Sequence, residues 1–389
     1  MFLEGHSYHA GFLLNSWELT SLLHVPPAHL LQRRKAPITV LETLRPEAAL
    51  DEGTPVGICD DAGCEMLVCI PKDTRMEHTH LIGTTGQGKS TVMLHMMLDD
   101  IRRGEGLALF DPHGHLVDDL LSRIPVEHTP RVIYIDPGGK DWVPLWNPLR
   151  SVSGQDPGRV ADDLVGAFRA FVTGWGHRLE HLLRHAILAV LHLPDGTLQD
   201  VADLLRKKSD ESERLRSRIA PLLENRLTRS FWQEDFLRYG NADLSPPQHK
   251  LSRLLASGNV SYMLSQPENR IDLRDVMDTG KILVVNLATI GSETREVLGC
   301  FMLSLLRLAA ISRSDIPPAA QKRFHIYCDE AHRFITDSIE DLIEETRKYN
   351  VSLALAHQYM SQFSTRKSDA IWLGGPPPQD AHYTMGRRA

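Results

Sequence analysis

An eight-residue pattern at residues 83–90 constrains the fold of this chain more than any other feature. It reads Gly-Thr-Thr-Gly-Gln-Gly-Lys-Ser and follows a short apolar run, His78–Ile82. The glycines let the backbone turn tightly and direct its N–H groups at phosphate oxygens, and a helix starting directly behind the loop adds its positive dipole. The pattern therefore predicts a strand, a phosphate-binding loop and a helix over Lys89–Arg103, closed by Gly104.

The loop residues have separate predicted roles in holding ATP and Mg²⁺. Lys89 is expected to reach the β- and γ-phosphates, and the Ser90 hydroxyl to bind Mg²⁺. A plain glycine-rich turn would leave the Lys-Ser pair and the helix start unexplained, so we expect a nucleotide site. The residues predicted to contact the nucleotide are Gly83, Thr84, Thr85, Gly86, Gln87, Gly88, Lys89, Ser90 and Thr91.

Two carboxylates follow a later apolar strand, Phe324–Cys328. We expect this strand to lie beside the loop strand, so that Asp329 binds Mg²⁺ directly or through water. Glu330 is then placed as the base that orients and deprotonates the attacking water. The alternative is a strand end that carries two solvated acids. Asp99 and Asp100, near the end of the loop helix, are expected to be exposed.

Three further polar residues lie where predicted strands begin or end. Gln358 follows the apolar run Val351–Ala356 and is predicted to sense the γ-phosphate or the attacking water, with a surface amide as the alternative. Arg347 precedes the same run, and its position leaves two roles open. It is either a cation supplied to nucleotide in a neighbouring subunit or a helix C-terminal cation. Asp111 ends the run Gly106–Phe110 and either supports the site or belongs to a plain connection.

Strand and helix patterns alternate on both sides of a long helical stretch. The alternation predicts an α/β fold with a parallel sheet, and the phosphate loop within it indicates a P-loop NTPase core. The stretch between the two halves reads as helix throughout, which predicts an all-α insertion. The expected domains are a mixed α/β leader (1–76), the two parts of the core (77–150 and 268–363), the insertion (151–267) and an irregular tail (364–389).

Composition bounds the partners and the location of the chain. The 389 residues carry a net charge of −7, so any grip on nucleic acid would be local rather than spread over a basic surface. Cys59, Cys64 and Cys69 are evenly spaced, but no fourth cysteine or paired histidine completes a zinc pattern, and we expect reduced thiols. We find no run of the roughly 18 apolar residues that a membrane span needs and no signal peptide. We therefore expect a cytoplasmic protein, or one docked to the inner membrane through a partner.

Taken together, these stretches resemble the HerA/FtsK-type P-loop motor ATPases and, within them, the conjugative coupling proteins of type IV secretion (TraD/TraG-like). The phosphate loop is common to NTPases, whereas the Asp-Pro-His-Gly turn, the Asn-Pro-Leu segment and the Arg-Lys to His-Gln spacing are more selective. The matching stretches run in order between about residues 55 and 363. They are His80–Ser90, Leu109–Leu116, Trp146–Leu149, Lys281–Leu287, Ile326–Ala331 and Arg347–Leu353, followed by His357 and Gln358.

The resemblance implies a homo-hexamer with ATP at the subunit interfaces, DNA in a central channel and the helical insertion at the channel mouth. It favours Arg347 as a cation that acts on a neighbouring subunit and Gln358 as the sensor. It also implies relaxosome or secretion-channel proteins as partners. The chain departs from membrane-bound coupling proteins in showing no N-terminal anchor, and the likeness ends near Phe363.

Three functions follow as hypotheses. The first is an ATP-dependent DNA translocase, or DNA-transfer motor, whose grip on DNA is directed at phosphates. The second is a secretion ATPase that acts on protein, which the net negative charge favours. The third is an ATP-binding fragment without turnover, because residues 364–389 show no further core strand. Stimulation of hydrolysis by DNA separates the first hypothesis from the second, and turnover itself separates both from the third.

Overall fold

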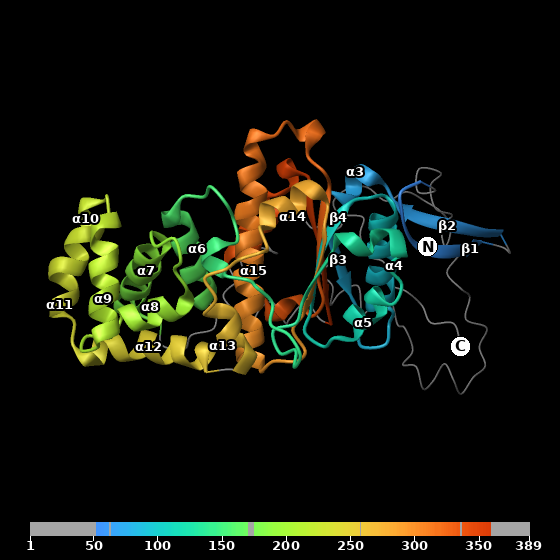
Figure 1. The fold of residues 1–389 in the computed structure, drawn as a ribbon. Coiled ribbons are helices and arrows are strands. Elements are labelled where there is room, and N and C mark those ends of the chain that lie inside the picture. Colours follow the sequence, from blue (N-terminus) through green and yellow to red (C-terminus); the bar gives the residue numbers. More distant parts are fainter. Residues whose placement is uncertain (1–51, 62–63, 170–174, 257, 335–336, 359–389) are drawn as a thin grey trace, which may run out of the picture.

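The computed structural model describes residues 52–358, apart from 62–63, 170–174, 257 and 335–336. A six-stranded sheet forms its centre (Figure 1), in the order β3-β8-β7-β4-β6-β5. All neighbouring strands are parallel, which confirms the predicted α/β class with a parallel sheet. The predicted tail and most of the predicted leader lie outside the described residues. The strands are β3 (Thr79–Ile82), β4 (Gly106–Asp111), β5 (Val132–Ile135), β6 (Ile282–Asn286), β7 (Phe324–Cys328) and β8 (Val351–His357).

The strand order corrects one prediction. β7 does not lie beside the loop strand β3, because β8 pairs with both of them, and Ala354 is the register partner of Thr79 on one side and of Tyr327 on the other. The end of β8 therefore borders the phosphate loop, where the Gly83 N–H donates to the His357 carbonyl oxygen at 3.3 Å. Order along the chain did not reveal this arrangement, because parallel strands are joined by crossovers that can pass over a neighbour.

Helices cover both faces of the sheet (Figure 1). Alternate residues of β4 show how the two layers arise, since side chains of a strand point to opposite faces. Leu107 and Leu109 join one buried core, Ala108 and Phe110 join the other, and all four are fully buried. The first core contains residues of α4 (Lys89–Arg102) and α5 (His115–Leu121), and the second contains residues of α14 (Leu273–Thr279) and α15 (Ser292–Ser312).

A helical region extends from the α15 side of the sheet, at the left of Figure 1. It contacts α15 through the rings of Phe168 and Phe301, whose centroids are 4.8 Å apart, and through an ion pair of 3.3 Å between Arg307 and Asp163. Its described residues form no strand, which agrees with the predicted all-α insertion. The helices are α6 (Pro157–Arg169), α7 (His177–Leu191), α8 (Leu198–Leu204), α9 (Asp210–Ile219), α10 (Arg226–Ser230), α11 (Phe236–Arg238), α12 (Asn241–Leu255) and α13 (Gly258–Leu264).

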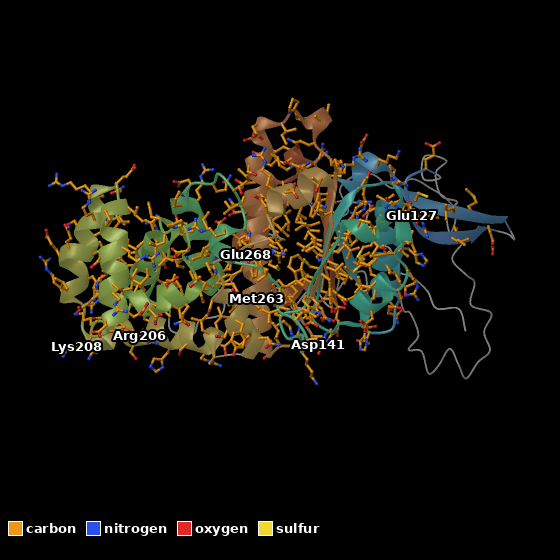
Figure 2. The ribbon with its side chains drawn as sticks, in the orientation of Figure 1. Glu127, Asp141, Arg206, Lys208, Met263 and Glu268 are labelled. Atoms are coloured by element: carbon orange, nitrogen blue, oxygen red, sulfur yellow. The ribbon has the colours of Figure 1, made fainter. Side chains whose placement is uncertain are left out.

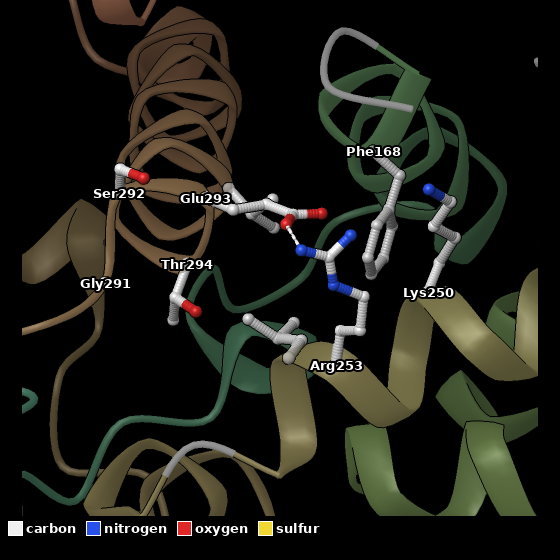
Figure 3. Close-up of a pocket in the computed structure, with 9 residues that line it drawn as sticks. Phe168, Lys250, Arg253, Gly291, Ser292, Glu293 and Thr294 are labelled. Atoms are coloured by element: carbon white, nitrogen blue, oxygen red, sulfur yellow. Dashed lines mark ion pairs between the residues drawn. The ribbon is translucent and has the colours of Figure 1, made fainter. Parts of the chain in front are cut away.

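A cavity of about 300 Å³ lies where α6, α12 and the start of α15 meet (Figure 3). Arg253 of α12 and Glu293 of α15 form an ion pair across it. None of the predicted site residues lines the cavity, so it is separate from the phosphate loop. The lining residues are Phe168, Lys250, Arg253, Leu254, Gly291, Ser292, Glu293, Thr294 and Val297.

α15 is long and apolar enough to cross a membrane, judged by length and composition alone. However, 78% of its most apolar stretch is buried inside the protein. A helix that packs between a sheet and further helices is apolar all round for that reason. We therefore interpret α15 as a core helix.

An antiparallel hairpin precedes the main sheet and packs against α4, at the right of Figure 1. Its strands are β1 (Thr54–Asp61) and β2 (Cys64–Ile70), followed by the short helix α3 (Lys72–Arg75). The run Met66–Ile70 predicts β2 from the sequence, whereas no comparable run predicts β1. β1 contains Pro55 and Gly57, residue types that are depleted in strands, so strand propensity does not predict it.

Asp100 is buried rather than exposed, so the prediction for it was wrong. Its side chain is 1% exposed, and its carboxylate lies 3.6 Å from the guanidinium of Arg75, which is equally hidden. Arg75 donates to the Tyr327 hydroxyl at 2.7 Å, and that hydroxyl donates to Asp100. α4 ends beneath the edge of the sheet where β7 and β8 begin. The buried acid is tolerated there because a cation and a hydroxyl compensate it.

Replacing Asp100 with alanine should destabilise the fold strongly, because Arg75 would be left as a buried, unpaired charge. Breaking a buried pair by removing one partner costs roughly 3–5 kcal/mol. The matched control is Asp119→Ala, which removes an exposed ion pair with Arg123 and should cost at most about 1 kcal/mol. Urea unfolding of both variants measures the difference, and equal losses would contradict a structural role for the buried pair.

Candidate functional site

The phosphate loop joins β3 to α4 as its sequence predicts. Gly88 is the N-cap of α4 in the left-handed region, with φ of 88°, a backbone that glycine adopts without strain. Gly88 has no side chain to cap this helix start, so the first N–H groups of α4 suit an anion. The ammonium group of Lys89 lies over the loop and donates to the carbonyl oxygens of Gly83 at 2.6 Å and Thr84 at 3.3 Å. The exposed side chains of Ser90 and Thr91 lie on the first turn of α4.

Asp329 and Glu330 lie at the end of β7. The Asp329 N–H donates to Phe110 of the adjacent strand at 3.1 Å, which fixes where the chain leaves the sheet. Burial raises the pKa of the Asp329 carboxyl, and the charge of Asp111 raises it further, whereas the nearby cation of Lys89 lowers it. Several carboxyl groups are therefore close together at this site, and a bound cation would offset their mutual repulsion. The oxygens of Ser90 and Asp329 are the ligand type that Mg²⁺ prefers, so these residues fit that ion.

Glu330 is held from two sides in a strained backbone conformation. Its φ is 47° in the left-handed region, uncommon for a residue other than glycine and often found at functional sites. Gln358 donates to one carboxylate oxygen at 3.0 Å. The Nδ1 atom of His332 lies 3.4 Å from the other oxygen. The predicted sensor and the predicted base are thus in direct contact. The sequence did not indicate His332, because nothing but the turn after β7 brings it back to Glu330.

Asp111 has a structural role at the same edge of the sheet. Its carboxylate accepts hydrogen bonds from the backbone N–H groups of His113 at 2.7 Å, Leu116 at 2.8 Å and Val117 at 3.1 Å. These bonds hold the turn after β4 and the start of α5. Of the two readings that the sequence left open, Asp111 therefore serves the connection, while its charge also acts on Asp329.

A pair of histidines, not singled out as a site by the sequence, lies beneath the loop. The ring centroids of His80 on β3 and His357 on β8 are 4.2 Å apart. Burial lowers the pKa of His80 to about 3, and the neighbouring ring of His357 lowers it as well. His80 is therefore neutral at pH 7, and the pair packs the loop strand against the strand that carries Gln358.

Arg347 is not part of this assembly. It lies in the short helix η9 (Arg347–Tyr349), before β8, and so at the opposite edge of the sheet from Gln358, which follows β8. A strand of this length spans roughly 20 Å at about 3.3 Å per residue, too far for the side chain to reach the phosphate loop of its own chain. The Arg347 side chain is 60% exposed and forms an ion pair with Glu77 at 2.9 Å.

The structure thus brings together most, but not all, of the predicted site residues. The phosphate loop, Lys89, Asp329, Glu330 and Gln358 share the carboxyl edge of the sheet, where ligands bind in open α/β folds. Arg347 lies outside this group, too far from the phosphate loop of its own chain to contact a nucleotide bound there.

Residues 65–228 match the family described as the type IV secretion-system coupling protein DNA-binding domain. The chain resembles the type IV secretion coupling ATPases. The resemblance indicated by the motifs is therefore confirmed. A search of curated proteins by sequence gives no match.

Solved structures show the same fold at low sequence identity. The plasmid coupling protein TrwB, in complex with the non-hydrolysable GTP analogue GDPNP, matches with a TM-score of 0.58 and 16% identity over 84% of this chain and 71% of its own. TrwB with ADP and Mg²⁺ matches with a TM-score of 0.57 and 15% identity over 83% and 72%. VirB4 of Thermoanaerobacter pseudethanolicus matches with a TM-score of 0.54 and 16% identity over 83% and 82%. At these identities the likeness establishes the RecA-like fold and not the activity.

Proposed function

We propose that this chain is an ATP-hydrolysing motor of the conjugative coupling type that moves DNA. The observation that carries the proposal is the contact between Gln358 and Glu330 beside the phosphate loop. It joins a residue placed to act as a base to a residue at the end of the strand that borders the loop. Such a contact can tie hydrolysis to movement of the chain, which a passive nucleotide-binding domain does not need.

The described residues have complementary roles in this proposal. Lys89 exchanges its loop carbonyl contacts for β- and γ-phosphate oxygens, and the uncapped start of α4 directs its N–H groups at the same phosphates. Ser90 and Asp329 would hold Mg²⁺, which supplies charge neutralisation between the β- and γ-phosphates. Glu330 orients the attacking water and accepts its proton, and Gln358 moves when Glu330 releases it.

DNA as the cargo rests on the matched family and on local charge. The family that matches residues 65–228 is described as a DNA-binding domain. Although the net charge of the chain is −7, residues 206–238 of the helical region carry nine Lys and Arg against six Asp and Glu. Arg206 and Lys208 lie at the end of that region far from the sheet (Figure 2). This local excess of basic residues suits a grip on phosphates that weakens with salt.

The position of Arg347 supports assembly of several subunits into a ring. A cation that cannot reach its own nucleotide can complete the site of a neighbour, so we propose a homo-hexamer with ATP between subunits. We place the protein in the cytoplasm, or at the inner membrane through a partner such as a relaxosome or secretion-channel protein.

The test is the ATPase rate of the purified chain alone, with single- and double-stranded DNA and with an unfolded protein. A rate raised at least severalfold by DNA at low salt, and not by protein, is the expected result. Stimulation by unfolded protein alone would favour a secretion ATPase acting on protein, which the net charge favours. Nucleotide binding without turnover under any condition would contradict the motor and leave an ATP-binding fragment.

A further inference from the structure

The segment Arg75–His78 contacts β7, β8 and the turn that carries Arg347. These three parts of the protein have separate roles in the proposed function. Arg75 is buried among the strands, Glu77 pairs with Arg347, and His78 bonds to the chain on both sides of the Arg347 turn. These contacts come from the end of α3 and the residues before β3, a stretch in which the sequence indicated no chemistry.

Arg75 anchors the segment to the strands that end at the nucleotide site. Arg75 is 2% exposed, and its guanidinium donates to the Tyr327 hydroxyl of β7 at 2.7 Å and to the Ser352 hydroxyl of β8 at 3.5 Å. β7 leads to Asp329 and Glu330, and β8 leads to Gln358. A buried guanidinium with several fixed acceptors has little freedom to move.

The imidazole of His78 forms hydrogen bonds to the chain before and after the turn that carries Arg347. Its Nε2 atom lies 2.8 Å from the carbonyl oxygen of Ile343, in α16 (Asp337–Glu345) before the turn. Its Nδ1 atom accepts from the N–H of Leu353 in β8, after the turn, at 3.0 Å. Burial lowers the pKa of His78, so the ring is neutral at pH 7. A neutral ring protonated at Nε2 satisfies both contacts at once.

The backbone of His78 is itself unusual. Its φ is 72° in the left-handed region, which costs free energy for a residue other than glycine and persists only where the surroundings impose it. This conformation lets the imidazole face α16 and β8 while the preceding residue, Glu77, reaches outward. Glu77 then meets Arg347 through one carboxylate oxygen and one guanidinium nitrogen, Nη2, at 2.9 Å. Within the described part of the chain no other acceptor contacts this guanidinium, so its remaining donors can meet a second acceptor.

We propose that Glu77 and His78 are positioning residues for Arg347, holding it at the sheet edge in the orientation in which it meets nucleotide bound by a second copy of this chain. The inference rests on the proposed function, in which Arg347 acts on a neighbouring subunit. His78 sets the position of the turn, Glu77 sets the direction of the guanidinium, and Arg75 ties both to the strands of the chain's own nucleotide site.

The first measurement is the steady-state ATPase of Glu77→Ala, with Glu77→Gln and Asp119→Ala as controls. Glu77 is 53% exposed, so the variant should fold. An exposed ion pair is worth up to about 1 kcal/mol, and we expect kcat to fall about fivefold with the nucleotide Kd unchanged. Glu77→Gln keeps an oxygen acceptor for Arg347 and should recover part of the rate. Asp119→Ala removes an ion pair of similar exposure and should match the parent chain.

The second measurement asks whether Glu77 and His78 act through Arg347. Single-turnover hydrolysis, which resolves slow rates, is compared for Glu77→Ala and His78→Asn alone and combined with Arg347→Ala. Asparagine tolerates the left-handed backbone, and thermal unfolding verifies that the variant folds. We expect the rate of His78→Asn to fall about tenfold, since the change weakens the two hydrogen bonds of the imidazole. Neither Glu77→Ala nor His78→Asn should lower the rate further once Arg347 is absent.

The outcomes separate this inference from the proposed function. No turnover by the parent chain, or an Arg347→Ala variant as fast as the parent, would contradict the function on which the inference rests. With both of those as expected, the inference is overturned by any of three results. These are a Glu77→Ala rate equal to or above the parent, a changed Kd with an unchanged kcat, or equal losses with and without Arg347.

Discussion

Glu330→Gln is expected to lower kcat by about 10²–10⁴-fold, the usual contribution of a general base, while ATP still binds. Glutamine keeps the shape of the side chain and an oxygen that accepts from Gln358, now 3.0 Å from the carboxylate, but it cannot take a proton from water. Because the phosphate loop is untouched, the loss should appear in turnover and not in the nucleotide Kd. Steady-state ATPase together with titration of a labelled nucleotide measures both quantities.

The control for this change is Glu127→Gln, which removes the charge of an exposed glutamate in the segment between α5 and β5 (Figure 2). It should turn over ATP like the parent. A Glu330→Gln variant that kept more than about a third of the parent rate would show that another group activates the water. A large rise in Kd would show instead that Glu330 supports binding.

Arg347→Ala is expected to lower kcat by about 10³–10⁵-fold, the effect attributed to a cation supplied to the γ-phosphate by another subunit. The loss should occur although Arg347 lies roughly one strand length from the nucleotide of its own chain. An exposed cation that only complements a helix end would contribute about 0.3–1 kcal/mol to stability and nothing to the chemical step. The size of the loss in ATPase rate therefore separates the two roles that the sequence left open.

Mixing variants shows whether the cation acts between subunits. An Arg347→Ala chain keeps its own loop and Glu330, and a Glu330→Gln chain keeps its Arg347. Where the two meet in a ring, one complete site forms at the shared interface, so the mixture should turn over ATP faster than either variant alone. A mixture no faster than its components would place the essential role of Arg347 within its own chain.

The sequence predicted those parts of the fold and of the phosphate-loop edge that depend on the local spacing of residues. β7 (Phe324–Cys328) begins and ends as predicted, because buried parallel strands are continuous apolar runs bounded by polar residues. The loop lies between a strand and a helix, as its glycines and its Lys-Ser pair require. Lys89, Asp329, Glu330 and Gln358 share one edge because all follow parallel strands, whose carboxyl ends meet there.

The tertiary structure decided what depends on neighbours distant in the chain. The place of β8 between β3 and β7 and the burial of Asp100 against Arg75 both join residues whose spacing has no period to detect. Asp100 looked like a surface acid because polar residues near a helix end are usually solvated. It is buried because Arg75, from a different element, compensates its charge. Local pattern thus determined the elements and the residues at their ends, whereas the packing of those elements determined which charges are paired and on which edge Arg347 lies.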